Sequence, residues 1–167
     1  MNQELQEKLY KSFPKIFRQK DLSMKHTAMC WGISCGDGWY NIIHTLCMHL
    51  QHLVDNPNEQ IEMYNGWISD EEKKEVPRKD WINKCNSFIE NEKEKIIPQL
   101  EAVQVKEKFG VLRFYLSGYP DNDIMSAKIR SYISFAESMS AKTCEICGSP
   151  GKVNEGAWIT VRCNNCK

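Results

Sequence analysis

Hydrophobic residues return with a helical period in two stretches of the N-terminal half. Over residues 3–12 they recur at every fourth position, which predicts a short amphipathic helix that Pro14 ends. A longer stretch begins at residue 39, and we expect Asn56-Pro57 to end its helix. The apolar positions are Leu5, Leu9 and Phe13 in the first stretch, and Trp39, Ile42, Ile43, Leu46, Cys47, Leu50, Leu53 and Val54 in the second.

Two further stretches have the same period. One runs from about Asp80 to Pro98 and the other from about Asn122 to Met139, so each predicts a helix. Before them, residues 69–72 fit a helix capping box, which predicts a short helix near residues 70–75. The residues expected to face inward are Trp81, Ile82, Cys85, Phe88, Ile89 and Ile96 in one helix, and Met125, Ile129, Tyr132, Ile133, Ala136 and Met139 in the other.

Between these two helices the hydrophobic period changes to two, which is the period of a β-strand. Residues 100–109 and 111–117 are expected to form two strands. Because Gly110 alone separates them, they should pair as a tight antiparallel hairpin.

Four cysteines close the chain with the spacing C-x2-C-x15-C-x2-C. Two C-x2-C pairs can turn four thiolates toward one ion, as in a zinc ribbon. Gly148 suits the tight turn after the first pair, Glu155-Gly156 supplies another turn, and residues 158–161 favour a strand. Two disulfides or four unliganded thiols are the alternative. The predicted ligands of one structural Zn²⁺ are Cys144, Cys147, Cys163 and Cys166.

The predicted fold class is α+β, with about four helices, a small antiparallel sheet near residues 100–117 and a C-terminal zinc ribbon. We expect residues 1–139 to form the α+β body and residues 140–167 to form the ribbon. No flexible Gly/Ser linker separates the two, so the ribbon should pack on the body. Four sulfur ligands leave no open coordination position, so the zinc is expected to be structural and not catalytic.

Composition and charge narrow the class of protein. With 41% hydrophobic and 26% charged residues, the chain is of the globular type, and no apolar stretch approaches the roughly 20 residues that span a bilayer. The N-terminus lacks the features of a secretory signal, so a reduced cytoplasm is expected, where cysteines bind metal rather than form disulfides. The 22 basic and 22 acidic residues balance, which gives no overall electrostatic basis for binding nucleic acid.

A candidate ligand loop precedes the predicted helix at residue 39. Free amides at a helix N-terminus can receive a phosphate or carboxylate, and two glycines would let the backbone approach it. The alternative is that Asp37 caps the helix, and its negative charge disfavours an anion beside it. The loop residues are Gly36, Asp37, Gly38 and Trp39.

The predicted hairpin carries a second candidate surface for a ligand or partner. Strand alternation puts Lys106 and Lys108 on one face, and we expect Arg113 and Tyr115 to lie on the wetter face of the other strand. Arginine can grip a phosphate or carboxylate with two donors, and tyrosine can stack on a base. The alternative is a solvated face on which Arg113 pairs with Glu107 across the hairpin.

Two other metal sites are alternatives that the sequence leaves undecided. Gln104-Val105-Lys106 fits a variant of a metal-dependent nuclease strand, with Glu94 or Glu101 as its carboxylate. A second zinc site could form at a C-x4-C pair in the loop before residue 36. Its ligands would be Cys30 and Cys35 with His26 or His44.

Three stretches of the chain carry a family resemblance. They are CGDGW at residues 35–39, QVKEKFGVLRFY at residues 104–115, and a C-terminal stretch from AES at residues 136–138 through TCEICGSPG at residues 143–151 to Trp158, Thr160 and the last cysteine pair. Together they resemble a group of small proteins encoded by bacteriophages and prophages, with a C-terminal CxxCG…CxxC zinc ribbon. The resemblance implies a phage accessory protein in the cytoplasm of a host bacterium.

The function expected from these observations is binding without catalysis. A zinc site without an open coordination position, zero net charge and five tryptophans fit a module that binds a host component, most simply a host protein. The phage resemblance adds inhibition of host defence, for instance of an immune or nucleic-acid-processing factor. One alternative is a sponge for a small ligand such as a nucleotide. The others are a metal-dependent enzyme that processes nucleic acid and a zinc ribbon that binds it.

Overall fold

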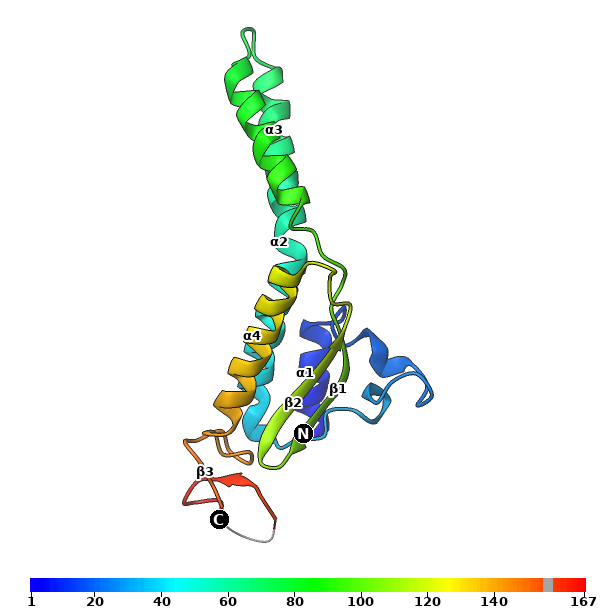
Figure 1. Cartoon of the computed structure of the whole chain (residues 1–167), viewed down its shortest axis with the longest axis vertical. Helices are drawn as coiled ribbons and strands as arrows, with labels where there is room; N and C mark the ends of the chain where they lie inside the picture. Colours follow the sequence, from blue (N-terminus) through cyan, green and yellow to red (C-terminus); the bar gives the residue numbers. More distant parts are fainter. Residues whose placement is uncertain (155–157) are drawn as a thin grey trace. The chain divides into compact units, whose positions relative to one another are not determined.

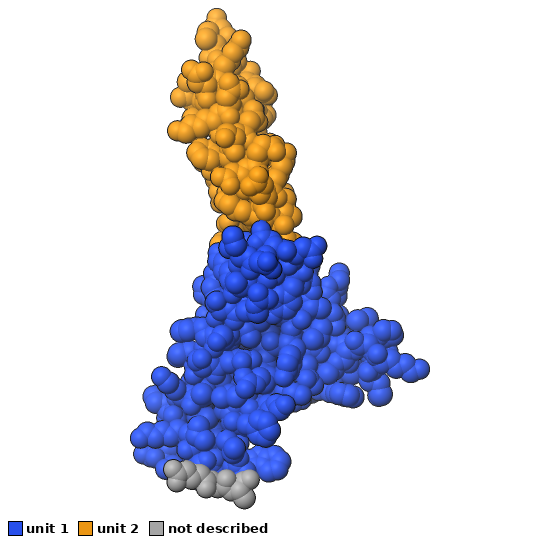
Figure 2. Space-filling view, in the orientation of Figure 1, with its two compact units in different colours: residues 1–51, 99–167 blue, residues 52–98 orange. Residues whose placement is uncertain are grey.

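The computed structural model describes residues 1–154 and 158–167, so the turn expected at Glu155-Gly156 lies outside the described residues. The chain divides into two compact units, which Figure 2 draws in different colours. Unit 1 comprises Met1–Gln51 and Gln99–Lys167, and unit 2 comprises His52–Pro98. Helix α2 (Tyr40–Glu72) contributes its first part to unit 1 and the rest to unit 2.

The helices of unit 1 follow the predicted apolar period. α1 (Gln3–Ser12) and α4 (Asp123–Ser140) confirm two predicted helices, and the first part of α2 runs beside α4 (Figure 1). The Asn2 and Asn122 side chains cap α1 and α4, because each accepts a hydrogen bond from an amide in the first turn, at 2.9 and 3.0 Å. Short 3₁₀ turns lie at Arg18–Asp21, Met29–Trp31 and Asp37–Trp39.

The predicted antiparallel hairpin is confirmed, with strands β1 (Glu101–Lys108) and β2 (Val111–Ser117). Its turn residues, Phe109 and Gly110, both have left-handed backbone, with φ of 53° and 78°. Positive φ at both central positions gives a type I′ turn, whose twist matches that of paired strands. One face of the hairpin is buried, and it includes Val105, Leu112 and Phe114.

The core of unit 1 joins segments that are distant in the sequence. The Ala102 amide donates to the Ile16 carbonyl at 2.8 Å, and the rings of Phe17 and Phe114 lie 6.5 Å apart. These contacts close the N-terminal segment over the hairpin. The largest fully buried side chains are Trp39, Phe17, Leu9, Ile16, Met29, Ile43, Leu50, Leu100, Leu112, Ile129, Val105 and Val161.

The C-terminal segment adds a second pair of short strands, β3 (Lys152–Val153) and β4 (Val161–Arg162). The strand expected over residues 158–161 therefore begins only at Val161. The fold class is confirmed for the described residues: four α-helices, a two-stranded antiparallel sheet and a C-terminal four-cysteine segment with its own strand pair.

Unit 2 is built from two helices, the later part of α2 and α3 (Lys79–Lys93). α3 confirms the helix predicted from residue 80, although it ends at Lys93 and not at Pro98. The end of α2 predicted at Asn56-Pro57 is wrong, because Pro57 is buried inside the helix. A proline in a helix costs about 3 kcal/mol.

Apolar packing explains why α2 continues past its proline. Tyr64 and Trp67 on α2 contact rings on α3, so the helix is stabilised by burial beyond Pro57. The separate helix predicted near residues 70–75 is also wrong, because residues 70–72 are the last turn of α2. Among the described residues, no helix is long and apolar enough to cross a membrane.

Candidate functional site

The four C-terminal cysteines converge on one point. Their sulfur atoms all lie within 4.8 Å of one another, and those of Cys147 and Cys163 are 3.6 Å apart. Four sulfurs bound at about 2.3 Å to one tetrahedral ion would lie about 3.8 Å apart, so the spacing fits a metal centre. The thiols of all eight cysteines are free, which goes against the disulfide alternative.

Backbone groups shape the first cysteine pair for a cation. The Gly148 amide donates to the Cys144 carbonyl at 2.9 Å, and Gly148 takes the left-handed φ of 78° that this turn requires. The hydroxyl and amide of Ser149 beside Cys147 lower the pKa of that thiol to about 6. Burial opposes ionisation of Cys144, but the backbone amides around its sulfur outweigh burial and lower its pKa. Both sulfurs are thus disposed to bind a metal as thiolates.

The loop at residues 36–39 is hydrogen-bonded to the turn that carries Cys144 and Cys147, which we call the cysteine knuckle. The Gly36 amide donates to the Glu145 carboxylate at 2.9 Å, and the Gly38 amide donates to the Glu145 carbonyl at 2.8 Å. The Trp39 indole donates to the Thr143 carbonyl at 2.9 Å. The backbones are so close that a Cβ atom on Gly36 would lie 2.2 Å from the Glu145 carbonyl oxygen. We call this contact the knuckle clasp.

The knuckle clasp changes the interpretation of the predicted ligand loop. The Gly36 and Gly38 amides both donate hydrogen bonds to Glu145 within unit 1, so they are not directed at an anion. Asp37 lies inside the 3₁₀ turn that leads into α2, and Gly36 is the N-cap of that turn. The Asp37 carboxylate accepts hydrogen bonds from the amide and side chain of Asn2, both at 2.7 Å.

The hairpin brings two of its predicted site residues together. The Lys106 ammonium lies 5.8 Å from the centre of the Tyr115 ring, and Tyr115 is 41% exposed. The Lys108 ammonium lies 5.4 Å from the ring of Phe109, at the exposed turn. Lys106 and Tyr115 therefore form a small amphipathic surface, and Lys108 belongs to the turn.

Arg113 has a different partner from the one considered in the sequence. Its guanidinium donates to the Glu137 carboxylate on α4 at 2.6 Å, and both side chains are partly buried. Glu107 instead accepts the Gly110 amide at 2.6 Å and so supports the hairpin turn. The ion pair of Arg113 links β2 to α4.

The other metal sites considered in the sequence are not assembled among the described residues. The Cys30 thiol donates to the Thr27 carbonyl at 3.2 Å, and burial raises the pKa of Cys35 to about 12. The Glu101 carboxylate is bound by Arg18 and Gln19. Within the described ranges, the four C-terminal cysteines are the one group of at least three potential ligands that converges.

Unit 2 carries a row of aromatic side chains. The rings of Phe88 and Tyr64 stack at 5.4 Å, Tyr64 meets Trp67 edge-on at 5.4 Å, and Trp67 lies 6.3 Å from Trp81. The Arg78 guanidinium extends the row, 5.7 Å from the centre of the Trp81 ring. Trp67 and Phe88 are 44% and 41% exposed, so part of the row faces solvent. We call these five residues the aromatic row.

Glu71 fixes one end of the aromatic row. Its side chain is almost fully buried and accepts two hydrogen bonds from the Arg78 guanidinium, both at 2.8 Å. Lys74 donates a further hydrogen bond at 2.6 Å. The Arg78 guanidinium and the Lys74 ammonium hold the pKa of Glu71 well below its usual range. The cation of the row is therefore held in place before any partner arrives.

The zero net charge of the chain conceals opposite charges on the two units. Residues 52–98 contain 11 acidic and 7 basic residues, which gives unit 2 a net charge of −4. The other 11 acidic and 15 basic residues give unit 1 a net charge of +4. The aromatic row thus belongs to an acidic helix pair.

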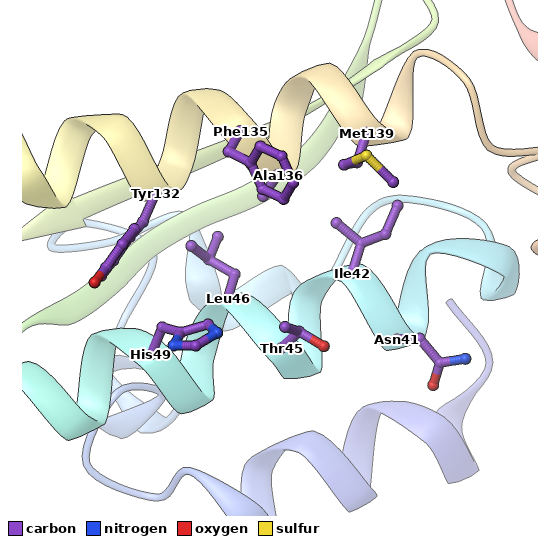
Figure 3. Close-up of a pocket in the computed structure, with 9 residues that line it drawn as sticks. All are labelled: Asn41, Ile42, Thr45, Leu46, His49, Tyr132, Phe135, Ala136 and Met139. Carbon is purple, nitrogen blue, oxygen red and sulfur yellow. The ribbon is translucent and has the colours of Figure 1, made fainter.

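An apolar groove lies in unit 1 between α2 and α4. Figure 3 shows that side chains of both helices line it, and its hollow has a volume of about 510 Å³. At one point of the lining, the rings of His49 and Tyr132 lie 5.6 Å apart. The lining includes Ile42, Thr45 and Leu46 of α2 and Tyr132, Phe135 and Met139 of α4. We call this surface the α2–α4 groove.

Neither the aromatic row nor the groove was predicted from the sequence. Phe88 and Met139 were expected to face inward, but they are 41% and 42% exposed. The signal for the row was available: Tyr64 and Trp67 are three positions apart, and Trp81 and Phe88 are seven apart, so each pair shares one helix face. Comparisons of the chain with protein-family models, with curated proteins and with solved structures find no match.

Proposed function

We propose that this chain is a non-catalytic binding protein that contacts a partner protein through the aromatic row of unit 2. The row carries the proposal, because interface hot spots are enriched in tryptophan, tyrosine and arginine. It contains two tryptophans, a tyrosine and an arginine in one continuous set of contacts. Ring stacking and the hydrogen bonds that Arg78 donates to Glu71 already order these side chains, so binding would cost little further entropy.

The charge of unit 2 supports a particular class of partner. A net charge of −4 attracts a basic protein surface and repels the phosphates of nucleic acid. The exposed rings of Trp67 and Phe88 add apolar contact area. We therefore propose a protein partner whose contact surface is basic and includes an apolar pocket for a ring.

The metal in this proposal is one structural Zn²⁺. Zn²⁺ favours tetrahedral thiolate sites, and four thiolates leave no position open for water. Its role would be to shape the knuckle that Gly36 and Gly38 bind. Because the strands of the ribbon are only two residues long, the ion would supply most of the free energy that folds it.

The biological setting of the proposal rests on the resemblance to phage-encoded proteins. We propose that the chain is a phage accessory protein that acts in the cytoplasm of a host bacterium. Its partner would be a host protein, such as an immune or nucleic-acid-processing factor, and binding would inhibit host defence.

Affinity capture with matched variants tests the proposed function. Tagged wild-type protein, Trp67→Ala and Trp31→Ala are incubated with lysate of a bacterial host, and the retained protein is identified, purified and titrated. Trp31 is 66% exposed and lies in unit 1, so it controls for loss of an exposed indole. We expect Trp67→Ala to weaken the affinity at least about 10-fold and Trp31→Ala to leave it unchanged. Equal affinities for all three proteins would refute a role for the row.

A nucleotide-binding function is the second candidate, and the Lys106–Tyr115 pair favours it. A base could stack on Tyr115 while Lys106 meets a phosphate. Nucleotide that co-purifies with the wild type and is lost in Tyr115→Ala would support this function. Magnesium-dependent cleavage of DNA or RNA that is lost in Lys106→Ala would instead support the enzyme alternative.

A further inference from the structure

We infer that the α2–α4 groove is the contact surface of a symmetric dimer, in which the groove of one copy packs against the same groove of a second copy of this chain. The inference goes beyond the proposed function, because it concerns unit 1 and the proposed partner surface lies in unit 2. It rests on the exposure, the charge and the shape of the groove.

Large apolar side chains of the groove face solvent. Phe135 is 68% exposed and Met139, one turn further along α4, is 42% exposed. On α2, Met48 is 48% exposed and lies one turn from Thr45. Apolar side chains gathered on one face mark an interaction site, and aromatic residues and methionine are enriched in such sites.

The charge of the groove favours a second copy as its occupant. In a twofold contact, residues near the axis meet their own copies, so any charge there would face an identical charge. Residues 38–54 contain no Asp, Glu, Lys or Arg, and they include the α2 side of the groove. On α4, Glu137 is bound to Arg113, and Lys128 and Arg130 lie outside the lining. None of the residues that line the groove is Asp, Glu, Lys or Arg, so a charged partner helix would find no carboxylate, ammonium or guanidinium of opposite charge in the lining.

The shape of the groove is self-complementary. Phe135 stands largely exposed on the wall of the hollow of about 510 Å³, so one surface offers both a projecting ring and a cavity. A twofold rotation would insert Phe135 of each copy beside Leu46 and Tyr132 of the other. Figure 3 shows α2 and α4 side by side in one copy. Two copies would then form a four-helix arrangement with an apolar centre.

The test measures the mass of the full-length, zinc-loaded chain in solution over a wide range of concentrations. We expect twice the 19.5 kDa mass of one chain, with dissociation on dilution. Phe135→Glu should raise the dissociation constant at least about 100-fold, because it buries an unpaired charge beside Leu46 and Tyr132 of the other copy in a desolvated contact. Thr45→Glu tests the α2 side in the same way, and Thr45 is exposed, so both variants should fold. Phe109→Glu is the matched control, since Phe109 is 70% exposed on the β1–β2 turn and should leave the dimer intact.

Metal content and melting temperature of each variant establish that it is folded. A wild type that remains a monomer at every concentration overturns the inference. So does a dimer that persists in both Phe135→Glu and Thr45→Glu. If the wild type is monomeric and Phe135→Glu abolishes capture of the partner protein, the groove binds that partner and the dimer is refuted. The proposed function can fail independently, because its test variant, Trp67→Ala, lies in unit 2.

Discussion

Unit 1 joins segments far apart in the sequence, whereas unit 2 joins two helices that follow one another. In unit 1, the Ser34 amide reaches the Val105 carbonyl at 3.0 Å and the Gly38 amide reaches Glu145 at 2.8 Å. In unit 2, the ion pairs Asp70–Lys73 and Glu90–Lys93 join residues three positions apart, Arg78 pairs with Glu71 only seven positions away, and rings connect the helices. Unit 1 is therefore stabilised by contacts between segments far apart in the sequence, and unit 2 by the side-chain contacts between α2 and α3.

Aromatic residues are buried at some positions of the molecule and exposed at others. Trp39 and Phe17 are completely buried in unit 1, while Trp31 and Phe135 of the same unit are 66% and 68% exposed. In unit 2, Trp67 and Phe88 of the aromatic row are more than two-fifths exposed, so the same residue types complete a core at some positions and form a surface at others. Burial, which the number of tryptophans does not reveal, separates a residue that stabilises the fold from one that is available to bind.

Removing the metal should have the largest effect, and we expect it to be confined to unit 1. Structural zinc supplies about 10–16 kcal/mol in small zinc domains, so a chelator or Cys163→Ser should unfold the ribbon and open the knuckle clasp. Hydrogen exchange should accelerate at Gly36 and Gly38 and remain unchanged in α3. Elemental analysis should give one zinc per chain. A ratio of zero in reduced, unchelated protein would contradict the metal centre, and a ratio of two would revive Cys30 and Cys35 as ligands.

Two glycine substitutions should change stability in opposite directions. A Cβ on Gly38 would lie 2.2 Å from the Cys144 carbonyl oxygen, so Gly38→Ala should destabilise unit 1 by roughly 1–3 kcal/mol. Gly66 lies in α2 within unit 2, and a Cβ there meets nothing within 4 Å. Gly66→Ala should therefore stabilise its helix by about 0.5–1 kcal/mol. Denaturant unfolding measures both changes, and a harmless Gly38→Ala would argue against the knuckle clasp.

Acid should weaken unit 2 through Glu71. Its folded pKa lies below the value of about 4.3 for an unfolded glutamate, because Arg78 and Lys74 stabilise the carboxylate. A lowered carboxyl pKa adds stability that is present above the unfolded pKa and is lost as the pH falls toward the folded one. We expect exchange in the aromatic row to accelerate below about pH 4, and Glu71→Gln should flatten that dependence. An equally steep pH profile in the variant would rule out Glu71 as the cause.

Arg113→Ala should have the smallest effect on stability. Its ion pair with Glu137 is only partly buried, so its loss should cost at most about 1 kcal/mol after solvent screening. Thermal unfolding of Arg113→Ala measures this cost. A much larger loss would show that the β2–α4 link is central to unit 1, and loss of partner binding without a stability change would move the binding surface to the hairpin.

Local patterns in the sequence predicted much of the fold. The period of Leu5 and Leu9 gave α1, and the change of period around Gly110 gave the hairpin, because both depend on neighbours in the chain. The spacing of the four cysteines predicted their cluster for the same reason. The helix end predicted at Pro57 was wrong, because packing of α2 on α3 outweighs the local cost of a proline.

The candidate sites depended on contacts that no local pattern contains. The amides of Gly36 and Gly38 were candidates for binding a ligand, but they donate hydrogen bonds to Glu145, which lies more than a hundred positions away in the chain. Arg113 likewise pairs with Glu137 on α4 and not with a residue of its own hairpin. The aromatic row forms only where α2 packs against α3, and this packing could not be predicted once the helix was expected to end at Pro57.

Hydrogen exchange of the purified complex tests most directly whether unit 1 supports the fold while unit 2 binds the partner. The account predicts that the partner slows exchange in residues 60–72 and 78–89, which contain the aromatic row, and leaves the cysteine knuckle and the hairpin at residues 101–117 unchanged. Slowed exchange in the hairpin, with residues 60–72 and 78–89 unaffected, would contradict it.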